Sequence, residues 1–440
     1  MQKIQEIYAK TERPERVVQF GEGGFLRGFV DWMFQKLADS GKFDGSVVVV
    51  QPIEKGMCDK LSEQNCLYTH VMRGLENGKP TVNRDVISVI SRCVKPYDDF
   101  DAYLKLAENP DLQFVVSNTT EAGIAYHAGD QLTDRPAVSY PAKLTQFLYH
   151  RFQKGLPGLI LLPCELIDRN GEKLAAIVRQ YAEEWQLGDA FLNWLDTENH
   201  FCCTLVDRIV TGFPKNEDLQ LGYEDNMRNT SELFHLWVIE GDPIVEKALP
   251  LKEIGLNVVF TDNLEPYRTR KVRILNGAHT SLVPYAMLRG FETVGDCMND
   301  SNMHAYLEKC VFEEIIPTLD LPKEELTAYA KDVFERFANP YIRHMLSSIA
   351  LNSVSKFKVR VLPSILEYKK RFGSYPQTLL KGFAALLAFY KTDMANDDPA
   401  IMAFLKTATT AEALARADFW GMDLSFLTEE VERLADSSVR

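Results

Sequence analysis

Several common sequence signals are missing from this chain, and each absence excludes a class of protein. No apolar run in its 440 residues approaches the ~20 residues that a membrane-spanning helix needs. The net charge is −13 and no block of lysine and arginine occurs, so the surface would repel nucleic acid and anionic membranes. The opening residues lack the apolar core and the cleavage site of a signal peptide. We therefore expect a cytoplasmic protein that binds a small molecule, and its oligomeric state is left open.

Metal-binding patterns are missing as well. The chain has 8 cysteines, but it contains no CxxC pair and no HExxH motif. Several of these cysteines lie in apolar runs, as Cys93 does, where a free thiol behaves as a small hydrophobic group. We therefore expect reduced cysteines and no metal site.

The first part of the chain alternates strand-like and helix-like segments. Helical patterns occupy residues 142–154 and 171–185, and Asn170 is a candidate cap of the second helix. The alternation predicts a Rossmann-type α/β domain with a parallel-rich sheet over residues 1–265, with a polar excursion near 212–235. The predicted strands are almost continuously apolar, as strands covered on both faces are: 16–20, 46–50, 112–117, 158–163 and 204–210.

Residues 266–440 follow a different pattern. Apolar residues recur there at spacings of three and four, which indicates amphipathic helices. A chain of this length is also expected to form more than one hydrophobic core. The sequence therefore predicts a mainly α-helical C-terminal domain, to which we assign the substrate and the catalytic groups.

A glycine-rich turn follows the first predicted strand, in VVQFGEGGFLRGF. Glycines at such a turn let the backbone approach a pyrophosphate at the start of a helix. Leu26 stands where the dinucleotide fingerprint has its third glycine, so an ordinary tight turn remains an alternative. The candidate cofactor-binding residues of this segment are Val18, Gln19, Phe20, Gly21, Glu22, Gly23, Gly24, Phe25, Leu26 and Arg27.

Two later strand ends extend the predicted cofactor site. Gln51 stands where an acidic residue would hold the ribose of NAD; it can hydrogen-bond a ribose, but it leaves the choice between NAD and NADP open. The loop SNTTEAG follows the predicted strand 112–117, and ligands bind at the carboxyl ends of parallel strands. Its candidates are Asn118, Thr120 and Glu121; the alternative is a turn in which Asn118 and Thr119 bond to their own backbone.

The stretch KVRILNGAH places three polar side chains in an apolar region. On an α-helix, at about 100° per residue, Lys271, Asn276 and His279 fall within one sector of about 140° and could converge on one molecule. Burial beside Ile274 and Leu275 would lower the pKa of the lysine, as a general base requires. The asparagine could donate to an oxygen that gains charge. Taken singly, each residue also has an ordinary structural explanation.

These motifs resemble the mannitol dehydrogenase family of polyol-specific long-chain dehydrogenases. The resemblance runs through GEGGFLR, TEAG, CELIDRNG, VDRI and the spacing K-x4-N-x2-H. It implies a metal-independent NAD enzyme in which Lys271 is the general base, Asn276 polarises the reacting oxygen and His279 binds substrate. It also implies that Asp207 and Lys356 bind substrate.

Within the family, the chain is similar to the branch that acts on uronates. Leu166 stands where the polyol-specific members carry an asparagine, and we expect it to be buried and unable to bind a hydroxyl. The resemblance implies NADH-dependent reduction of D-tagaturonate to D-altronate, a keto-uronate and hexonate pair of galacturonate breakdown. The alternatives are a fructuronate reductase, a mannitol dehydrogenase and, more remotely, an inactive nucleotide-binding regulator. The cations considered for the substrate carboxylate are Arg343, Lys356, Lys358 and Arg360, of which Lys356 is preferred.

Overall fold

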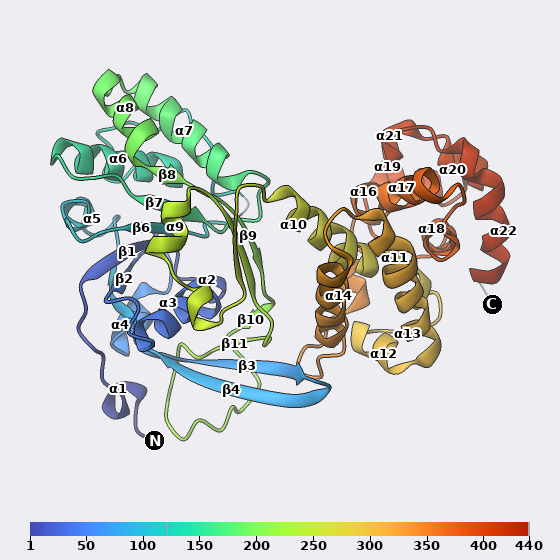
Figure 1. The fold of residues 1–440 in the computed structure, drawn as a ribbon, viewed down its shortest axis with the longest axis horizontal. Helices are drawn as coiled ribbons and strands as arrows, with labels where there is room; N and C mark the ends of the chain where they lie inside the picture. The colour runs from blue at the N-terminus through green and yellow to red at the C-terminus, as the bar shows by residue number, and fades with distance from the viewer. Residues whose placement is uncertain (121, 439–440) are drawn as a thin grey trace. The chain divides into compact units, whose positions relative to one another are not determined.

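A computed structural model describes residues 1–120 and 122–438, and the chain divides into two compact units (Figure 1). Unit 1 comprises Met1–Arg73 and Val82–Leu264, and unit 2 comprises Gly74–Thr81 and Glu265–Arg440. Residues 74–81, which the sequence analysis assigned to the first domain, group with unit 2. Each unit is described separately below.

A parallel sheet forms the centre of unit 1. Its six strands lie in the order β5-β2-β1-β6-β7-β8, and every neighbouring pair is parallel. Counted along the chain, this is the strand order of the dinucleotide-binding Rossmann fold, so the predicted fold class is confirmed. The strands are β1 (Glu15–Phe20), β2 (Ser46–Val50), β5 (Ile90–Val94), β6 (Phe114–Ser117), β7 (Ile160–Pro163) and β8 (His200–Phe201).

Helices cover both faces of this sheet, as the apolar strands require. Alternate strand residues belong to two different cores: Val17 and Val49 to one, Val18 and Val48 to the other. The first core includes side chains of α2 (Gly24–Gly28), α3 (Val30–Asp39), α4 (Cys58–Glu63) and α9 (Pro243–Ala248). The second includes side chains of α5 (Phe100–Leu106), α6 (Tyr140–Gln153), α7 (Asn170–Glu184) and α8 (Asp189–Glu198). Short helices α1 (Ile4–Ile7) and η1 (Lys252–Ile254) complete the unit.

The predicted single strand over 204–210 is wrong. Two strands occupy this region, β9 (Cys203–Asp207) and β10 (Val210–Gly212), and they belong to different sheets. Strand β9 pairs with β12 (Leu236–Glu240), which also pairs with β13 (Val258–Thr261). Strand β10 pairs with β11 (Asn229–Ser231) in a sheet that continues into β3 (Tyr68–Glu76) and β4 (Lys79–Ile87). The polar excursion therefore begins and ends in strands.

Unit 2 is helical, and α11 (Gly277–Met287) lies at its centre. Every residue from 277 to 286 is buried, which a helix surrounded by other helices requires. Helices α15, α16 and α18 pack against it. The other elements are α10 (Glu265–Arg270), η2 (Lys271–Asn276), α12 (Val294–Asn299), α13 (Ser301–Glu308), η3 (Lys309–Ile315), η4 (Ile316–Thr318), α14 (Lys323–Phe337), α15 (Leu346–Ile349), α16 (Ser353–Arg360), α17 (Leu362–Phe372), α18 (Gln377–Phe389), α19 (Pro399–Leu405), α20 (Thr410–Leu414), α21 (Ala417–Trp420), η5 (Ser425–Leu427) and α22 (Thr428–Ser438).

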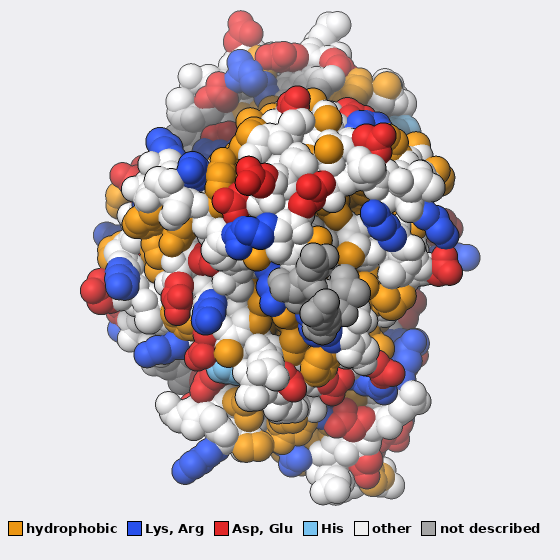
Figure 2. All heavy atoms as spheres, turned by 90° about the vertical axis from the view of Figure 1, so that its right-hand side faces the viewer, with side chains coloured by type: hydrophobic (Ala, Val, Ile, Leu, Met, Phe, Trp, Pro, Cys, Tyr) orange, Lys and Arg blue, Asp and Glu red, His pale blue; other side chains and the backbone are white. Residues whose placement is uncertain are grey.

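The surface mixes charges of both signs. On the face that Figure 2 shows, acidic and basic side chains are interspersed with apolar ones and do not gather by sign. Among the helices of residues 1–120 and 122–438, none has the length and hydropathy to cross a membrane. All of the cysteines are free thiols, and Cys93 is only partly buried.

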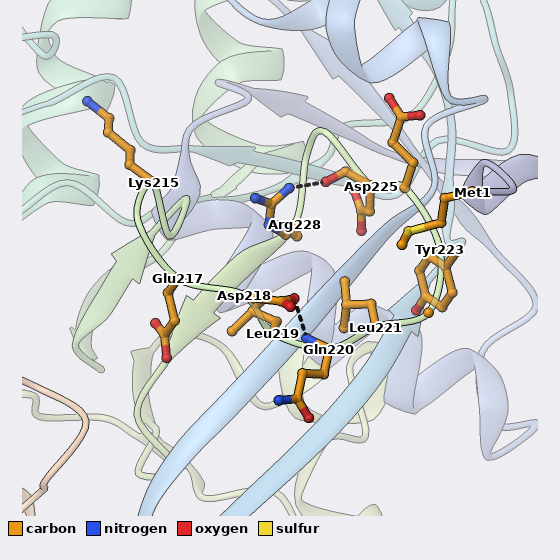
Figure 3. Close-up of a pocket in the computed structure, with 12 residues that line it drawn as sticks. Met1, Lys215, Glu217, Asp218, Leu219, Gln220, Leu221, Tyr223, Asp225 and Arg228 are labelled. Atoms are coloured by element: carbon orange, nitrogen blue, oxygen red, sulfur yellow. Dashed lines mark hydrogen bonds between the residues drawn. The ribbon is translucent and has the colours of Figure 1, made fainter.

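The loop between β10 and β11 encloses a cavity of about 720 Å³ in unit 1 (Figure 3). Its lining is mixed in charge, with Lys215, Glu217 and Asp218 beside Arg228. None of the residues predicted to bind cofactor or substrate lines this cavity. The strands at the two ends of the excursion nevertheless contact the glycine turn, because the amide of Asn229 donates to the carbonyl of Gly24 at 2.8 Å.

Candidate active site

The glycine turn after β1 leaves open space at one position. Gly21 has φ +117°, and a Cβ there would lie 3.0 Å from the carbonyl oxygen of Asn118, so this position requires glycine. Gly23 is exposed at the start of α2, and a Cβ added to it would meet no atom within 4 Å. The backbone at Gly23 can therefore approach a ligand closely, as a pyrophosphate site requires.

The close packing expected of the third glycine of the fingerprint is found at Gly28. A Cβ on Gly28 would lie 2.8 Å from Nδ2 of Asn229 and 2.9 Å from Cγ1 of Val210. Leu26, at the position of the missing glycine, is buried beside Gly21. The helix therefore approaches β10 and β11 two residues later than the fingerprint predicts, and the sequence analysis missed this glycine.

Several of the predicted cofactor contacts support the turn from inside the protein. The amide of Gln19 donates to the carbonyl of Gly21 (3.0 Å) and to Asp31 (3.2 Å), whose pKa burial raises to about 7. The guanidinium of Arg27 is buried and donates to the carbonyl of Glu22 at 3.0 Å. The side chains of four candidate residues are buried, and their predicted role in cofactor binding stays a prediction that only their backbone could fulfil: Val18, Gln19, Phe20 and Arg27.

The loop after β2 is tied to the glycine turn. A carboxylate oxygen of Glu22 accepts from the backbone N–H of Met57 at 3.0 Å. The amide of Gln51 donates to the carbonyls of Ile53 (3.0 Å) and Glu54 (3.1 Å). Both amide hydrogens of Gln51 therefore shape the loop, and its predicted contact with a ribose stays a prediction.

The SNTTEAG loop after β6 is anchored to the end of β7 through Glu165. This buried carboxylate accepts from the backbone N–H and the hydroxyl of Thr119, at 2.9 and 3.0 Å, and from the hydroxyl of Ser117 at 3.1 Å. The amide of Asn118 donates to the carbonyl of Cys164 at 2.8 Å. Among the described residues, the side chains of Asn118 and Thr119 thus bond to the segment after β7. Thr120 is exposed with φ +74°, and Glu121 lies outside the described residues.

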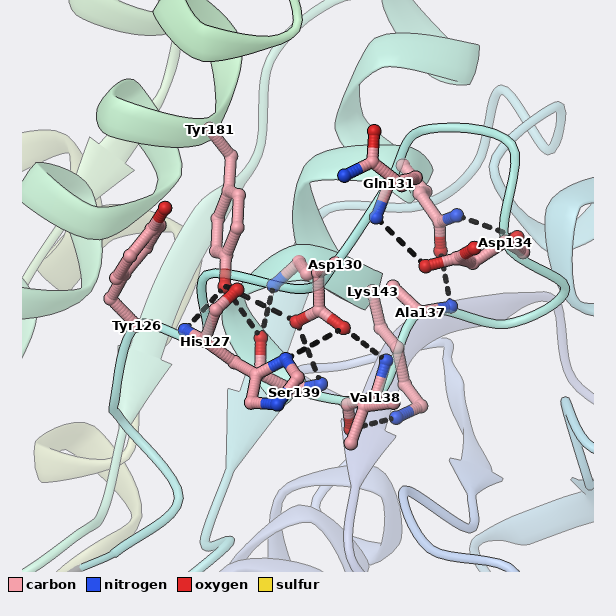
Figure 4. A network of polar contacts seen from close by, with 12 residues as sticks. Tyr126, His127, Asp130, Gln131, Asp134, Ala137, Val138, Ser139, Lys143 and Tyr181 are labelled. Atoms are coloured by element: carbon pink, nitrogen blue, oxygen red, sulfur yellow. Dashed lines mark hydrogen bonds and ion pairs between the residues drawn. The ribbon is translucent and has the colours of Figure 1, made fainter.

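A carboxylate also fixes the long connection from this loop to α6 (Figure 4). Asp130 accepts from the backbone N–H groups of Val138 (2.6 Å) and Ser139 (3.0 Å) and from the hydroxyl of Tyr181 (3.2 Å). Lys143 is fully buried beneath the connection and donates to the carbonyl of Val138 at 2.6 Å. Buried carboxylates therefore hold the described parts of the loop that follows β6.

The CELIDRNG segment after β7 differs from its predicted structure in two ways. Asn170 is not the cap of α7, because Arg169 occupies that position with φ +53°. The buried Asn170 side chain instead donates to the carbonyls of Pro163, Glu165 and Thr204 at 3.0 to 3.1 Å. Leu166 was expected to be buried, yet it is 62% exposed. The expectation of a buried leucine at this position is therefore wrong.

Acidic ligands occur near this segment, but an arginine lies among them. Glu172, Cys203 and Glu240 offer ligand atoms within 4.8 Å of one another. The Arg169 guanidinium forms an ion pair with Glu172 and another with Glu240, at 2.8 Å for the latter. A cation therefore already balances these carboxylates, and we assign no metal to them. Asp207, predicted to bind substrate, is buried at the end of β9.

In unit 2, Lys271 and Asn276 begin and end a π-helical turn, η2. The predicted α-helix over 271–279 is therefore wrong for its first residues. Because a π-helix bonds residue i to residue i+5, Asn276 follows Lys271 by about one turn, instead of standing about 140° away as in an α-helix. His279 lies three residues later on α11, a spacing that keeps it beside Asn276. The π turn thus aligns the three side chains more closely than the predicted helix would.

His279 has an environment suited to a neutral ligand-binding imidazole. Its ring is 7% exposed, stacks on Phe337 at 4.1 Å between centroids and meets the edge of His344 at 5.0 Å. Burial, helped by the charges of His344, Arg336 and Arg360, holds the pKa of His279 well below its ordinary value. Its Nε2 has no hydrogen-bond partner among the described residues. This nitrogen can bind a hydroxyl or carbonyl oxygen of a ligand.

Lys356 lies on α16, which packs against both α11 and the π turn. It is partly buried, and its ammonium donates to the carbonyl of Ile349 at 2.9 Å. Burial and the charge of Arg360 lower its pKa, while Asp397 acts in the opposite direction. Unit 2 therefore places Lys271, Asn276 and His279 along the consecutive helical segments η2 and α11. The cationic helix α16 packs beside these segments.

Two family models match the chain almost end to end. The mannitol dehydrogenase Rossmann domain matches residues 15–253, and the mannitol dehydrogenase C-terminal domain matches residues 263–437. The curated relatives include altronate oxidoreductases of Escherichia coli O6:K15:H31 (strain 536 / UPEC) and of Shigella flexneri. Each is 50% identical over 390 residues, which cover 87% of this chain and 81% of the relative.

Solved structures with the same fold are more distant in sequence. A D-sorbitol dehydrogenase in substrate-free form has a TM-score of 0.82 at 22% identity and covers 97% of this chain and 95% of its own. The ternary complex of Pseudomonas fluorescens mannitol 2-dehydrogenase with NAD and D-mannitol has a TM-score of 0.70 at 23% identity and covers 98% of this chain and 92% of its own. These likenesses establish the fold.

Proposed function

The chain belongs to the mannitol dehydrogenase family, and from this premise we propose that it reduces D-tagaturonate to D-altronate with NADH, reversibly. The reaction class follows from the family. The substrate rests on one observation, the 50% identity to altronate oxidoreductases over 87% of the chain. Altronate oxidation is the reverse of tagaturonate reduction.

The residues of the glycine turn fit a dinucleotide. Gly23 offers exposed backbone with open space where a side chain would stand, and Gly21 permits the turn that presents it. Glu22 places a carboxylate at the loop after β2, where it would repel the 2′-phosphate of NADP. Bound NADH supplies a hydride to the keto carbon of the substrate. The turn and the loop hold the cofactor through backbone groups.

The π turn supplies the groups that handle the oxygen of the reacting carbonyl. In the reductive direction, the ammonium of Lys271 gives a proton to this oxygen as negative charge develops on it, and in altronate oxidation the neutral amine takes the proton back. Asn276, one turn away, donates a hydrogen bond to the same oxygen. His279 is neutral, and its Nε2 is available for a neighbouring hydroxyl. These roles make the reaction independent of a metal.

A substrate panel tests the proposal against its siblings. With NADH as reductant, kcat/KM should be highest for tagaturonate, lower for fructuronate and lowest for fructose. Equal efficiency with fructose would make the protein a mannitol dehydrogenase, and preference for fructuronate would make it a fructuronate reductase. A folded protein that binds NADH and reduces none of them would be a nucleotide-binding regulator.

A further inference from the structure

Four cations between residues 343 and 360 were candidates for the carboxylate of the substrate, and three of them are directed elsewhere. Arg343 is exposed and lies 3.5 Å from Glu292. The ammonium of Lys358 lies 3.2 Å from the position of a Cβ on Gly421, at the end of α21. Lys356 is bonded to a backbone carbonyl. The fourth cation, Arg360, has a different environment.

The guanidinium of Arg360 is partly buried and poorly satisfied. Its one hydrogen bond within the described chain is a long contact of 3.4 Å from Nη1 to the hydroxyl of Thr280, and it has no ion pair there. A guanidinium has five N–H donors, so most of its donors have no protein acceptor. Burial lowers the pKa of Arg360, which reflects the cost of holding this charge away from water. A ligand that brings a negative charge would offset that cost.

Arg360 also lies near His279, whose Nε2 has no hydrogen-bond partner among the described residues. Its hydrogen-bond partner, Thr280, follows His279 directly on α11. The positive charge of Arg360 contributes to lowering the pKa of His279. The charge of Arg336 lowers the same pKa, but the Arg336 side chain is buried and has interactions of its own. Arg360 is therefore the cation with open donors beside the substrate-binding imidazole.

We propose that Arg360 binds the carboxylate of the substrate through paired hydrogen bonds from its planar guanidinium. The planar fork matches the two carboxylate oxygens, which a lysine cannot do. Lys356 stands one helical turn earlier on the same face of α16 and adds charge at longer range. This assignment rests on the proposed function, because a neutral polyol would leave the guanidinium without an anion.

The test compares altronate with its neutral primary amide, which keeps the same carbon chain and hydroxyl groups. For Arg360→Gln, kcat/KM for altronate oxidation should fall about 10- to 100-fold, mostly through KM, because a charge-assisted pair is lost. The amide should be oxidised with nearly unchanged kcat/KM. If turnover of the amide is too slow to follow, its inhibition constant against altronate replaces it. Arg360→Lys should fall between the two, and Lys358→Gln, a cation removed from the same helix, should match wild type.

Equal losses for altronate and the amide, or no loss for either, would overturn the assignment. NADH binding to each variant serves as the check of folding. If Arg360→Gln does not fold, methylguanidinium is added to the Arg360→Ala variant. Partial recovery of altronate oxidation would support the assignment, and no recovery would overturn it. A wild-type protein inactive on altronate would refute the proposed function, whereas an active wild type with an equally active Arg360→Gln would refute this assignment alone.

Discussion

The glycine turn of unit 1 and the π turn of unit 2 offer different parts of the chain to a ligand. At the glycine turn of unit 1, the side chains of Gln19 and Arg27 point into the core, and the exposed backbone at Gly23 is left for the ligand. At the π turn of unit 2, Ile274 and Leu275 are buried, and the proposed chemistry is assigned to the side chains of Lys271 and Asn276. The glycine-rich motif therefore indicates a backbone shape. The lysine, asparagine and histidine motif instead indicates candidate functional groups whose alignment depends on the helical pitch.

If the side chains carry the chemistry in unit 2, loss of Lys271 should have the largest effect. The Lys271→Ala variant should lose about 10²- to 10⁴-fold in kcat for tagaturonate, the usual contribution of a positioned acid–base group. Its affinity for NADH should not change. Lys309 is the matched control, because it is an exposed lysine that also begins a π turn, and Lys309→Ala should keep full activity. A turnover within threefold of wild type in Lys271→Ala would contradict the assigned role.

If the alignment of these side chains matters, adding one residue to the π turn should be nearly as harmful. An alanine inserted after Val272 would make Asn276 the sixth residue after Lys271, so that at about 100° per residue the two side chains would stand about 120° apart. We expect kcat to fall about 100-fold, as displacement of a catalytic group by about an ångström does. Circular dichroism and thermal melting would verify that the helical unit is folded. Full activity in a folded insertion variant would show that the alignment of Lys271 with Asn276 is not needed.

If backbone shape serves the cofactor in unit 1, a side chain at Gly23 should block it. Gly23→Val should fold, since a Cβ there meets no protein atom within 4 Å. It should raise the Kd for NADH at least about tenfold, which corresponds to about 1.4 kcal/mol. Fluorescence titration with NADH measures the effect. Wild-type affinity in the folded variant would place the pyrophosphate elsewhere.

Gly28 offers the matched substitution that should act on stability. A Cβ there would crowd Asn229 and Val210, so Gly28→Ala should lower the free energy of unfolding by about 1–3 kcal/mol, the usual cost of overpacking. The folded fraction should still bind NADH, because Gly28 does not face the open space. Denaturant unfolding tests the first expectation and NADH titration the second. A variant as stable as wild type would show that the neighbours shift without cost.

The smallest expected effect is that of chelators. If Lys271 handles the proton as proposed, prolonged dialysis against EDTA should leave kcat unchanged, because Arg169 already balances Glu172 and Glu240. Tagaturonate reduction before and after dialysis is the measurement. A loss of activity that zinc restores would require a metal in the mechanism.

The parts of the fold that carry a strong hydrophobic pattern could be predicted from the sequence. The apolar strands of the central sheet were found because both of their faces are buried. The hairpin of β3 and β4 was missed, although ENGK contains the Asn77–Gly78 pair whose positive φ angles make its turn. Strand β4 is largely exposed, so it lacks the hydrophobic signal on which the other predictions depended.

The sequence could propose the residues of the candidate site but not their geometry. The spacing of Lys271, Asn276 and His279 made them candidates, whereas nothing in those letters indicates a π turn. The exposure of Leu166 and the open donors of Arg360 depend on contacts with residues distant in sequence, which local patterns do not encode. The inward orientation of Gln19 and Arg27 was missed for the same reason.

The most direct test of the central claim, that Lys271 moves the proton, is the pH dependence of altronate oxidation. In the wild type, kcat should rise with pH through a single ionisation, because the amine must be neutral to accept the proton. In Lys271→Ala this ionisation should disappear, leaving a low rate that does not depend on pH over the same interval. The same ionisation, unchanged in the variant, would assign the proton transfer to another group and contradict the account.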